Sequence, residues 1–172
     1  TICVVHIFKR EEVDRQATAY HERVDSESFS ESVAMIWKSP ETVIRNALIS
    51  DADFTSLAGH RVYANIAPAD AALPFAIWRR SSVRREQTLS QPLGVPTVRL
   101  DLQIYAETYI TARKAADAAR GVLDGFRGSF DNTQVSLCSL DSESDGIAAL
   151  DGSEVPNAYL VTQEYDILWQ ES

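Results

Sequence analysis

The chain has few of the residues that build metal sites, disulfide frameworks and nucleophilic centres. Its 172 residues include two cysteines, three histidines and one methionine. Cys3 and Cys138 lie far apart, and neither has a second cysteine or a histidine at the spacing of a zinc site. The histidines occur singly. The sequence therefore predicts no metal site, and two free, buried thiols in a reducing compartment.

Motifs that bind cofactors or activate a nucleophile are also missing. The chain has no glycine-rich dinucleotide or phosphate loop and no Gly-x-Ser-x-Gly turn. The serines of residues 139–145 have no histidine nearby in sequence, and acid pairs such as Asp51 with Asp53 are not attached to an apolar pocket that would raise a pKa. We therefore expect no catalytic residues and no cofactor. A small hydrolase, the enzyme alternative, needs a pocket with converging acid, base and nucleophile.

Long hydrophobic runs and an excess of positive charge are absent too. The longer apolar runs, at residues 2–8 and 73–78, are far shorter than the roughly 20 residues that cross a bilayer. No basic segment precedes the first run, so no secretory signal is predicted. Lys and Arg total 16 against 25 Asp and Glu, for a net charge of -9. Phosphate backbones and anionic lipid should repel such a chain, so we expect no membrane partner and no specific nucleic-acid binding.

What the chain does have is the composition of a globular protein, with 45% hydrophobic residues, preceded by a polar segment. Residues 9–32 are dense in charge and serine and cannot bury much by themselves. Within them, Val13, Ala17, Tyr20 and Val24 recur at helical spacing, which leaves a short docking helix and a solvated arm both open. We expect an arm or extension at residues 1–34 and a compact domain at residues 35–172.

Hydrophobic patterning predicts the elements of that domain. Helical signals cover residues 40–50, with a further turn or two to residue 57 stopped by Gly59, and residues 108–127. Extended segments are expected at residues 61–66, 73–83, 98–105, 133–140 and 158–170. The resulting order is α-β-β-β-α-β-β, an α/β (α+β) fold.

The clearest strand and the clearest helix are complementary. In residues 98–105, Val98, Leu100, Leu102 and Ile104 face one way and polar residues or Tyr105 face the other. The helix that follows has Thr108 as its expected N-cap and an apolar stripe suited to cover that strand. The stripe consists of Tyr109, Ala112, Ala116, Ala119, Leu123 and Phe126.

Two stretches of opposite charge stand out. The basic one contains Arg79, Arg80, Arg84 and Arg85. The acidic one, residues 141–154, contains Asp141, Glu143, Asp145, Asp151 and Glu154 without a base, and is expected to be an exposed loop or an edge that meets a basic partner. Phosphate binding by the arginines is an alternative. Because the whole chain is acidic, we favour contacts between the arginines and an acidic protein surface, such as the acidic stretch of a neighbouring copy.

Several segments, taken in order, resemble a known family. They are LPFAIWRR at 73–80, VRLDLQIYA at 98–106, ARKAADAAR at 112–120 and LDGFRG at 123–128, with LAGHRVY at 57–63 before them. Together they resemble the tail completion, or tail terminator, proteins of siphophages. The resemblance runs from about residue 41 to 170 and leaves out residues 1–34.

The resemblance implies a fold like that of the lambda tail terminator, a mixed, mainly antiparallel sheet flanked by helices. It also implies a homohexameric ring in the neck region of the virion tail, assembled in the host cytoplasm. Such a ring sits on the last ring of tail tube protein, stops polymerisation and offers its other face to a head-side connector or stopper protein. DNA passes through its lumen, and no catalytic residues are implied.

Two other functions stay open. One is another head-tail connector or stopper ring, which would be mostly β-barrel, so the helix expected at 108–127 argues against it. The other is a small binding module that acts as a monomer.

Overall fold

The computed structural model describes residues 39–87, 89, 94–149 and 157–170. The expectations for the arm at residues 1–34, for Cys3, and for Asp151 and Glu154 lie outside these residues. The described helices are α2 (Pro40–Ser50), α3 (Ala52–Ala58) and α4 (Tyr109–Leu123). The strands are β1 (Val62–Ala64), β2 (Phe75–Arg84), β3 (Thr97–Ala106), β4 (Gly128–Phe130), β5 (Thr133–Ala149) and β6 (Asn157–Gln170).

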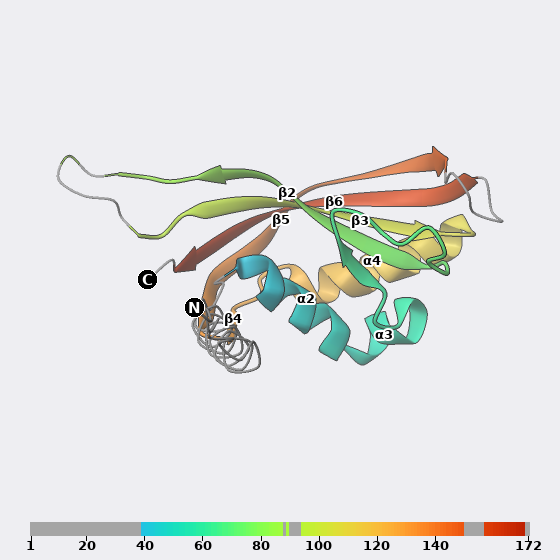
Figure 1. Ribbon diagram of the computed structural model, residues 1–172, viewed down its shortest axis with the longest axis horizontal. Helices are drawn as coiled ribbons and strands as arrows, with labels where there is room; N and C mark the ends of the chain where they lie inside the picture. Colours follow the sequence, from blue (N-terminus) through green and yellow to red (C-terminus); the bar gives the residue numbers. More distant parts are fainter. Residues whose placement is uncertain (1–38, 88, 90–93, 150–156, 171–172) are drawn as a thin grey trace, which may run out of the picture. The chain divides into compact units, whose positions relative to one another are not determined.

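The described strands form one mixed sheet in the order β1-β2-β3-β6-β5-β4. Strand β1 pairs parallel to β2, and every other neighbouring pair is antiparallel. Helices α2, α3 and α4 all lie on the same side of the sheet (Figure 1). We call that side the covered face and the other the open face. The arrangement confirms the predicted fold, a mainly antiparallel mixed sheet with helices packed on it.

The two central strands show why the sheet has unlike faces. In β3, Leu100, Leu102 and Ile104 are 0% exposed and point to the covered face. Their neighbours Gln103 and Tyr105 point to the open face and are half-buried. Strand β6 alternates in the same way, because side chains of a strand point to opposite faces in turn. The alternation expected for residues 98–105 is confirmed.

Helix α4 covers the centre of the sheet as predicted. The Thr108 side chain accepts a hydrogen bond from the backbone N–H of Thr111, which caps the first turn. The buried residues of α4 are Ala112, Ala115, Ala116, Ala119 and Leu123. Because alanine side chains are short, the helix axis lies close to β3 and β6. Tyr109 is 48% exposed, so the predicted stripe is wrong at its start. Phe126 packs against the core as predicted but follows the end of the helix.

Helix α2 begins at residue 40 and α3 is stopped by Gly59, as expected. Pro40 is the first residue of α2. The Asp51 side chain accepts the backbone N–H of Phe54 and caps α3, whose first turn also carries Asp53. Gly59 then ends α3 at a φ of 58°, a conformation that favours glycine.

Three strand predictions need correction. Strand β1 is only three residues long, and Ile66, expected in it, is 78% exposed. Strand β4 was not expected, although the positive φ angles of Asp131 and Asn132 form the two-residue turn that joins it to β5. Strand β5 does not stop at residue 140 but continues to Ala149, because β6 offers a paired backbone along its whole length.

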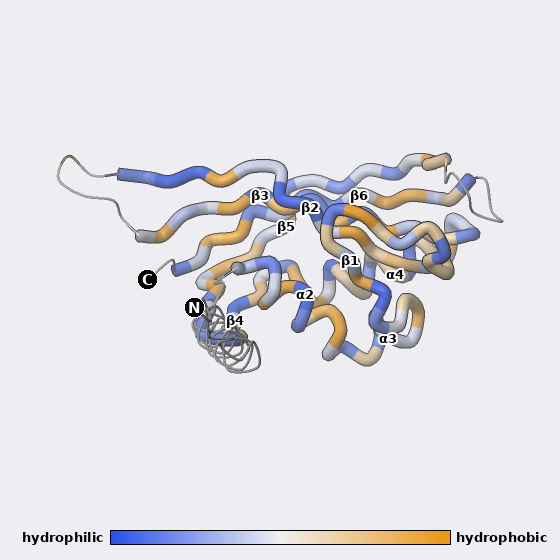
Figure 2. Tube along the Cα trace, viewed as in Figure 1, coloured by the Kyte–Doolittle hydropathy of each residue, from blue (hydrophilic) through white to orange (hydrophobic). Residues whose placement is uncertain are grey.

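The sheet is longer than the helical layer. The end of β2 and the start of β3 project beyond the helices at the left of Figure 1, while the end of β5 and the start of β6 reach the opposite, right-hand end. We call these the β2–β3 hairpin and the β5–β6 hairpin. Figure 2 shows that the outer part of β2 is mostly hydrophilic, with Val83 as an apolar residue within it. The two hairpins carry the charged stretches found in the sequence.

Candidate functional site

The four arginines of the basic stretch do not form one patch. Arg79 lies on the open face, where its Nη2 is 2.9 Å from Oδ2 of Asp101. Arg80, the next residue, points to the covered face and binds Glu41 of α2. Arg84 is the most exposed of the paired arginines, with 83% of its side chain accessible and a loose 3.8 Å contact to Glu86. Arg85 follows the end of β2.

Glu41 is a buried acid that the sequence analysis missed. It is 1% exposed and accepts hydrogen bonds from the Ser39 hydroxyl and from Nε of Arg80. Burial alone would raise the pKa of this carboxyl, but the hydrogen bonds from Arg80 and Ser39 outweigh it and hold the pKa below its usual value. The pair fixes the start of α2 to β2. The signal in the sequence is the position of Glu41 in the first turn of a predicted helix. If such an acid is buried, it needs a hydrogen-bond donor or a positive charge beside it.

The acidic stretch is part of β5 as far as the structure describes it, which matches the edge rather than the loop alternative. Asp141 contacts Arg99 at 3.0 Å. Glu143 and Asp145 both contact Nη1 of Arg113 on α4, at 2.6 and 3.2 Å. Within the chain, these three acids therefore meet arginines other than the four predicted partners. The two acids raise the pKa of Arg113 further.

A buried polar chain continues from Glu143 into the core. Nε2 of Gln163 donates to Oε2 of Glu143 at 2.7 Å and to the carbonyl of Ala116 at 2.9 Å. The Tyr165 hydroxyl donates to Oε1 of Gln163 at 2.9 Å, and burial raises the pKa of that phenol. These contacts tie α4 to β5 and β6. They are internal, so this part of the acidic stretch supports the fold.

The open face is charged and has a net negative balance in its centre. Arg99 lies between Asp141 and Asp166, at 3.0 and 3.1 Å. The acids facing this side are Asp101, Asp141, Glu164 and Asp166, against Arg79 and Arg99. Phe75 and Tyr105 stack at its edge with ring centroids 5.0 Å apart. No described helix covers this face.

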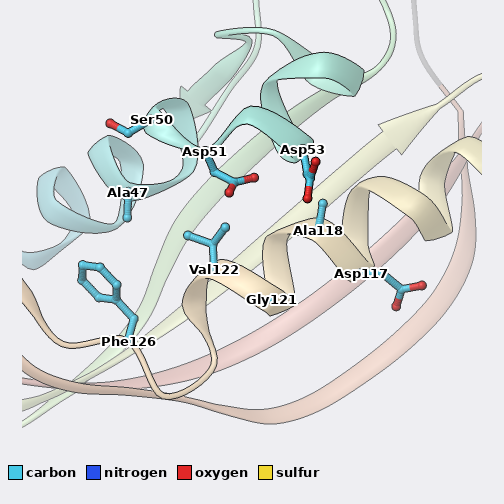
Figure 3. A pocket seen from close by; sticks show the side chains of 9 residues that line it. All are labelled: Ala47, Ser50, Asp51, Asp53, Asp117, Ala118, Gly121, Val122 and Phe126. Carbon is cyan, nitrogen blue, oxygen red and sulfur yellow. The ribbon is translucent and has the colours of Figure 1, made fainter.

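A shallow groove of about 530 Å³ runs between α4 and the α2–α3 pair (Figure 3). Its lining includes four small residues and three carboxylates. Asp51 caps α3 and Asp117 contacts Arg120 at 3.1 Å, so two of the three already have partners. The lining residues are Ala47, Ser50, Asp51, Asp53, Asp117, Ala118, Gly121, Val122 and Phe126. The groove has no histidine, cysteine or buried acid that would suit chemistry.

The described residues contain neither a metal-binding cluster nor a membrane-spanning helix. In those residues, no three His, Cys, Asp or Glu side chains are grouped where they would hold a metal ion. No described helix is both long and apolar enough to span a bilayer. Cys138 is free and buried, as predicted, and burial raises the pKa of its thiol to about 12.

The chain matches the model of a known protein family. Residues 42–155, more than half of the chain, match the family model described as Tail completion protein gp17. The match assigns the chain to a class, the structural proteins of phage tails, which are not enzymes. The chain belongs to the tail completion protein gp17 family and is a component of the virion tail. The resemblance found in the sequence is thereby confirmed.

Solved structures support the fold. One matching chain comes from a structure described as the virion of a native gene transfer agent (GTA) particle. It is 13% identical to this chain, with a TM-score of 0.58, and the match covers 73% of this chain and 91% of that one. At this identity the likeness shows a shared fold. No curated protein sequence matches the chain.

Proposed function

We propose that the chain assembles as a homohexameric ring that caps the tail tube, stops its polymerisation and joins the tail to the head-side connector or stopper protein. The observation that carries this proposal is the pair of projecting hairpins at opposite ends of the sheet, within a fold of the tail completion family. A ring needs a heterologous interface, in which one surface of each copy fits a different surface of the next. Two unlike hairpins meet that requirement.

The charge of the open face suits the channel of such a ring. DNA must pass the ring without binding, and cations in reach of phosphates would retard it. The open face has more acids than arginines at its centre, and its arginines are held by carboxylates. We therefore place the open face towards the lumen. A ring whose lumen is lined mainly by arginine and lysine would contradict this orientation.

The interface residues are proposed from the two charged stretches. Arg84 and Arg85 lie at the β2–β3 hairpin, and Asp141, Glu143 and Asp145 lie on β5, leading to Asp151 and Glu154. Arg79 and Arg80 are less suitable for a test, because a glutamate at Arg80 would face the buried Glu41 and damage the fold itself. The acids on β5 have partners within the chain, so their contacts with another copy would be shared.

A charge reversal tests the proposed interface. We expect Arg84→Glu with Arg85→Glu to weaken ring formation in sedimentation velocity, because it replaces attraction to the acidic stretch with repulsion. Lys114→Glu with Arg127→Glu is the matched control, since it changes the net charge equally at exposed positions elsewhere. Equal ring formation by both variants would refute the role of Arg84 and Arg85.

A tube-assembly experiment tests the function itself. Added to polymerising tail tube protein, the chain should shorten the tubes and cap one end in electron micrographs. Tubes of unchanged length without caps would contradict the capping role. A single mass of one chain at all concentrations, with no binding to tubes, would support the monomeric binding module instead.

A further inference from the structure

We propose that neighbouring copies in the ring are joined by backbone hydrogen bonds, with the free edge of β2 in one copy pairing with the free edge of β5 in the next. This proposal rests on the proposed ring. It adds the mode of contact, a sheet that continues from one copy to the next, and assigns the two strand segments that make it. The segments are residues 79–84 of β2 and residues 142–149 of β5.

Among the described residues, strand β5 is open along about half of its outer side. On that side β4 pairs only with residues 133–135. The turn after α4 then satisfies Cys138 and Leu140, through backbone bonds to Gly125 and Phe126 and the Asp124 carboxylate. Beyond Leu140, the only strand pairing that the described residues make with β5 is with β6. A row of backbone donors and acceptors is therefore presented over residues 142–149, which is a template for another strand.

Strand β2 is open in the same way at the other end of the sheet. Strand β1 pairs only with residues 76–78, and one more bond joins the N–H of Asn65 to the carbonyl of Trp78. From Arg79 to Arg84, the described residues pair with β2 only on its β3 side. Ser81 and Ser82 on this segment are exposed. Both outer edges of the sheet thus have a blocked part and an open part.

The strand directions and the offset of the two open parts fit a closed barrel. Strand β2 is antiparallel to β3, β3 to β6 and β6 to β5, so β5 meets the β2 of a rotated copy in antiparallel orientation. In register, residues 79–84 are level with the start of β3, and residues 142–149 with its end. If these two segments pair, each copy is displaced along the strand direction by roughly five residues, or about 17 Å, relative to the copy before it. Each copy adds four strands, which together are about 19 Å wide. The strands would then tilt by about 40°, within the 35–45° typical of barrels.

The size of such a barrel suits a DNA channel. Six copies with four strands each, spaced about 4.8 Å apart and tilted by about 40°, have a circumference of about 150 Å and a diameter of about 48 Å. The open face would line this barrel, because the helices cover the other side. Edge pairing and the lumen orientation proposed above therefore require the same arrangement of copies.

Charge favours pairing between unlike edges over pairing between like edges. Two β2 edges would bring Arg79, Arg80 and Arg84 against the same residues of another copy, and two β5 edges would oppose Glu143 and Asp145. Pairing β2 with β5 avoids both repulsions. A ring built from one kind of contact requires this unlike pairing, because a pairing of like edges closes a dimer.

Exposed apolar side chains next to the open edge of β5 are consistent with a covering partner. Ile147 is 71% exposed and pairs across the sheet with Tyr159, which is 40% exposed. The ring of Tyr159 lies 6.2 Å from that of Tyr109 in an edge-to-face contact. Such side chains at a strand edge are a liability in a lone chain. The β2–β3 hairpin of the next copy would shield them.

Disulfide scanning tests the proposal on the full chain with Cys3 and Cys138 replaced by alanine. One protein carries Ser82→Cys, whose side chain lies on the open face of β2. It is mixed with a second protein that carries a single cysteine on β5, scanned along the row that also faces the open side. That row is Ser142, Ser144, Gly146 and Ala148, and Glu143 and Asp145 face the covered side.

Under oxidising conditions we expect a mixed dimer at one of the four row positions, with at least tenfold less at the adjacent positions 143 and 145. This alternation is the mark of two paired strands, because neighbouring residues point to opposite faces. Equal cross-linking at all positions, or cross-links only between identical cysteines, would overturn the proposal. Circular dichroism of each variant shows whether it is folded, and the alternation is judged on the folded variants.

The ring itself is measured on the same samples by sedimentation. Rings that form without the alternating cross-link would refute edge pairing and leave the proposed function intact. A chain that neither forms rings nor cross-links, alone or on tail tubes, would refute both. Cross-linked rings support both.

Discussion

The two faces of the sheet are built from the same strands but differ in what their side chains do. On the covered face, β3 and β6 present apolar side chains such as Leu102 and Ile167 that are 0% exposed. On the open face, the intervening residues form charged contacts such as Arg99 with Asp166, both about 40% exposed. Burial of apolar area on one side holds the fold, while exposed ion pairs on the other add little to it. The open face thus contributes little to the free energy of folding.

The largest effect should come from the core of the covered face. Leu102→Ala is expected to lower the free energy of unfolding by about 3 kcal/mol, through lost burial and a residual cavity. Gln103→Ala, one residue along β3 on the open face, should change it by less than about 0.5 kcal/mol. Urea denaturation measures both. Similar losses for the two variants would remove the distinction between the faces.

Adjacent arginines give the next comparison. Arg80→Ala leaves the Glu41 carboxylate buried with Ser39 alone, and should cost about 2 kcal/mol, less than for a fully enclosed pair because Arg80 is 40% exposed. Arg79→Ala removes a more exposed pair with Asp101 and should cost about 0.5 kcal/mol. The difference in denaturation midpoint between the two variants checks this order. A larger loss for Arg79→Ala would show that the covered-face pair is not a structural anchor.

Acid should weaken the covered side. The pKa of Glu41 and that of Glu143 are lower in the folded chain, since hydrogen bonds from Arg80 and Ser39, and from Gln163 and Arg113, outweigh burial. The unfolded chain then binds more protons near the ordinary pKa of 4.5, so this stabilisation is present above that pH and is lost as pH falls below it.

The double variant Glu41→Gln, Glu143→Gln should start less stable at pH 7 and lose less stability between pH 6 and pH 3 than the original chain. Thermal denaturation across this range measures the slope. Parallel curves for the two proteins would mean that other carboxyls govern the acid response.

The smallest effect on folding is expected from the open face. Arg99→Ala should lower stability by roughly 0.2–1 kcal/mol, and by less as salt is added, because its contacts with Asp141 and Asp166 are solvent-exposed. Denaturation at low and high salt tests this. A large, salt-independent loss would indicate that the open face also carries core interactions.

The sequence alone predicted much of the fold, because local periodicity reports which side of an element is buried. The alternation of residues 98–105 and the alanine-rich stripe of α4 gave the central strand and its cover. Pro40 and Gly59 marked helix ends through local backbone chemistry, whereas the cap at Asp51 was not predicted. The family resemblance was equally visible in the sequence, and the matched family confirms it.

Only the tertiary structure decided which charges meet. Arg79 and Arg80 are neighbours in sequence but point to opposite faces, so one contacts Asp101 and the other a buried glutamate on α2. The acidic stretch became a strand because β6 supplied hydrogen-bond partners that no local pattern announces. Periodicity is a property of one segment, whereas ion pairs and open strand edges depend on which segments lie side by side. For that reason the sequence determined most of the elements and the family, and the fold determined which charges pair and which strand edges lie open.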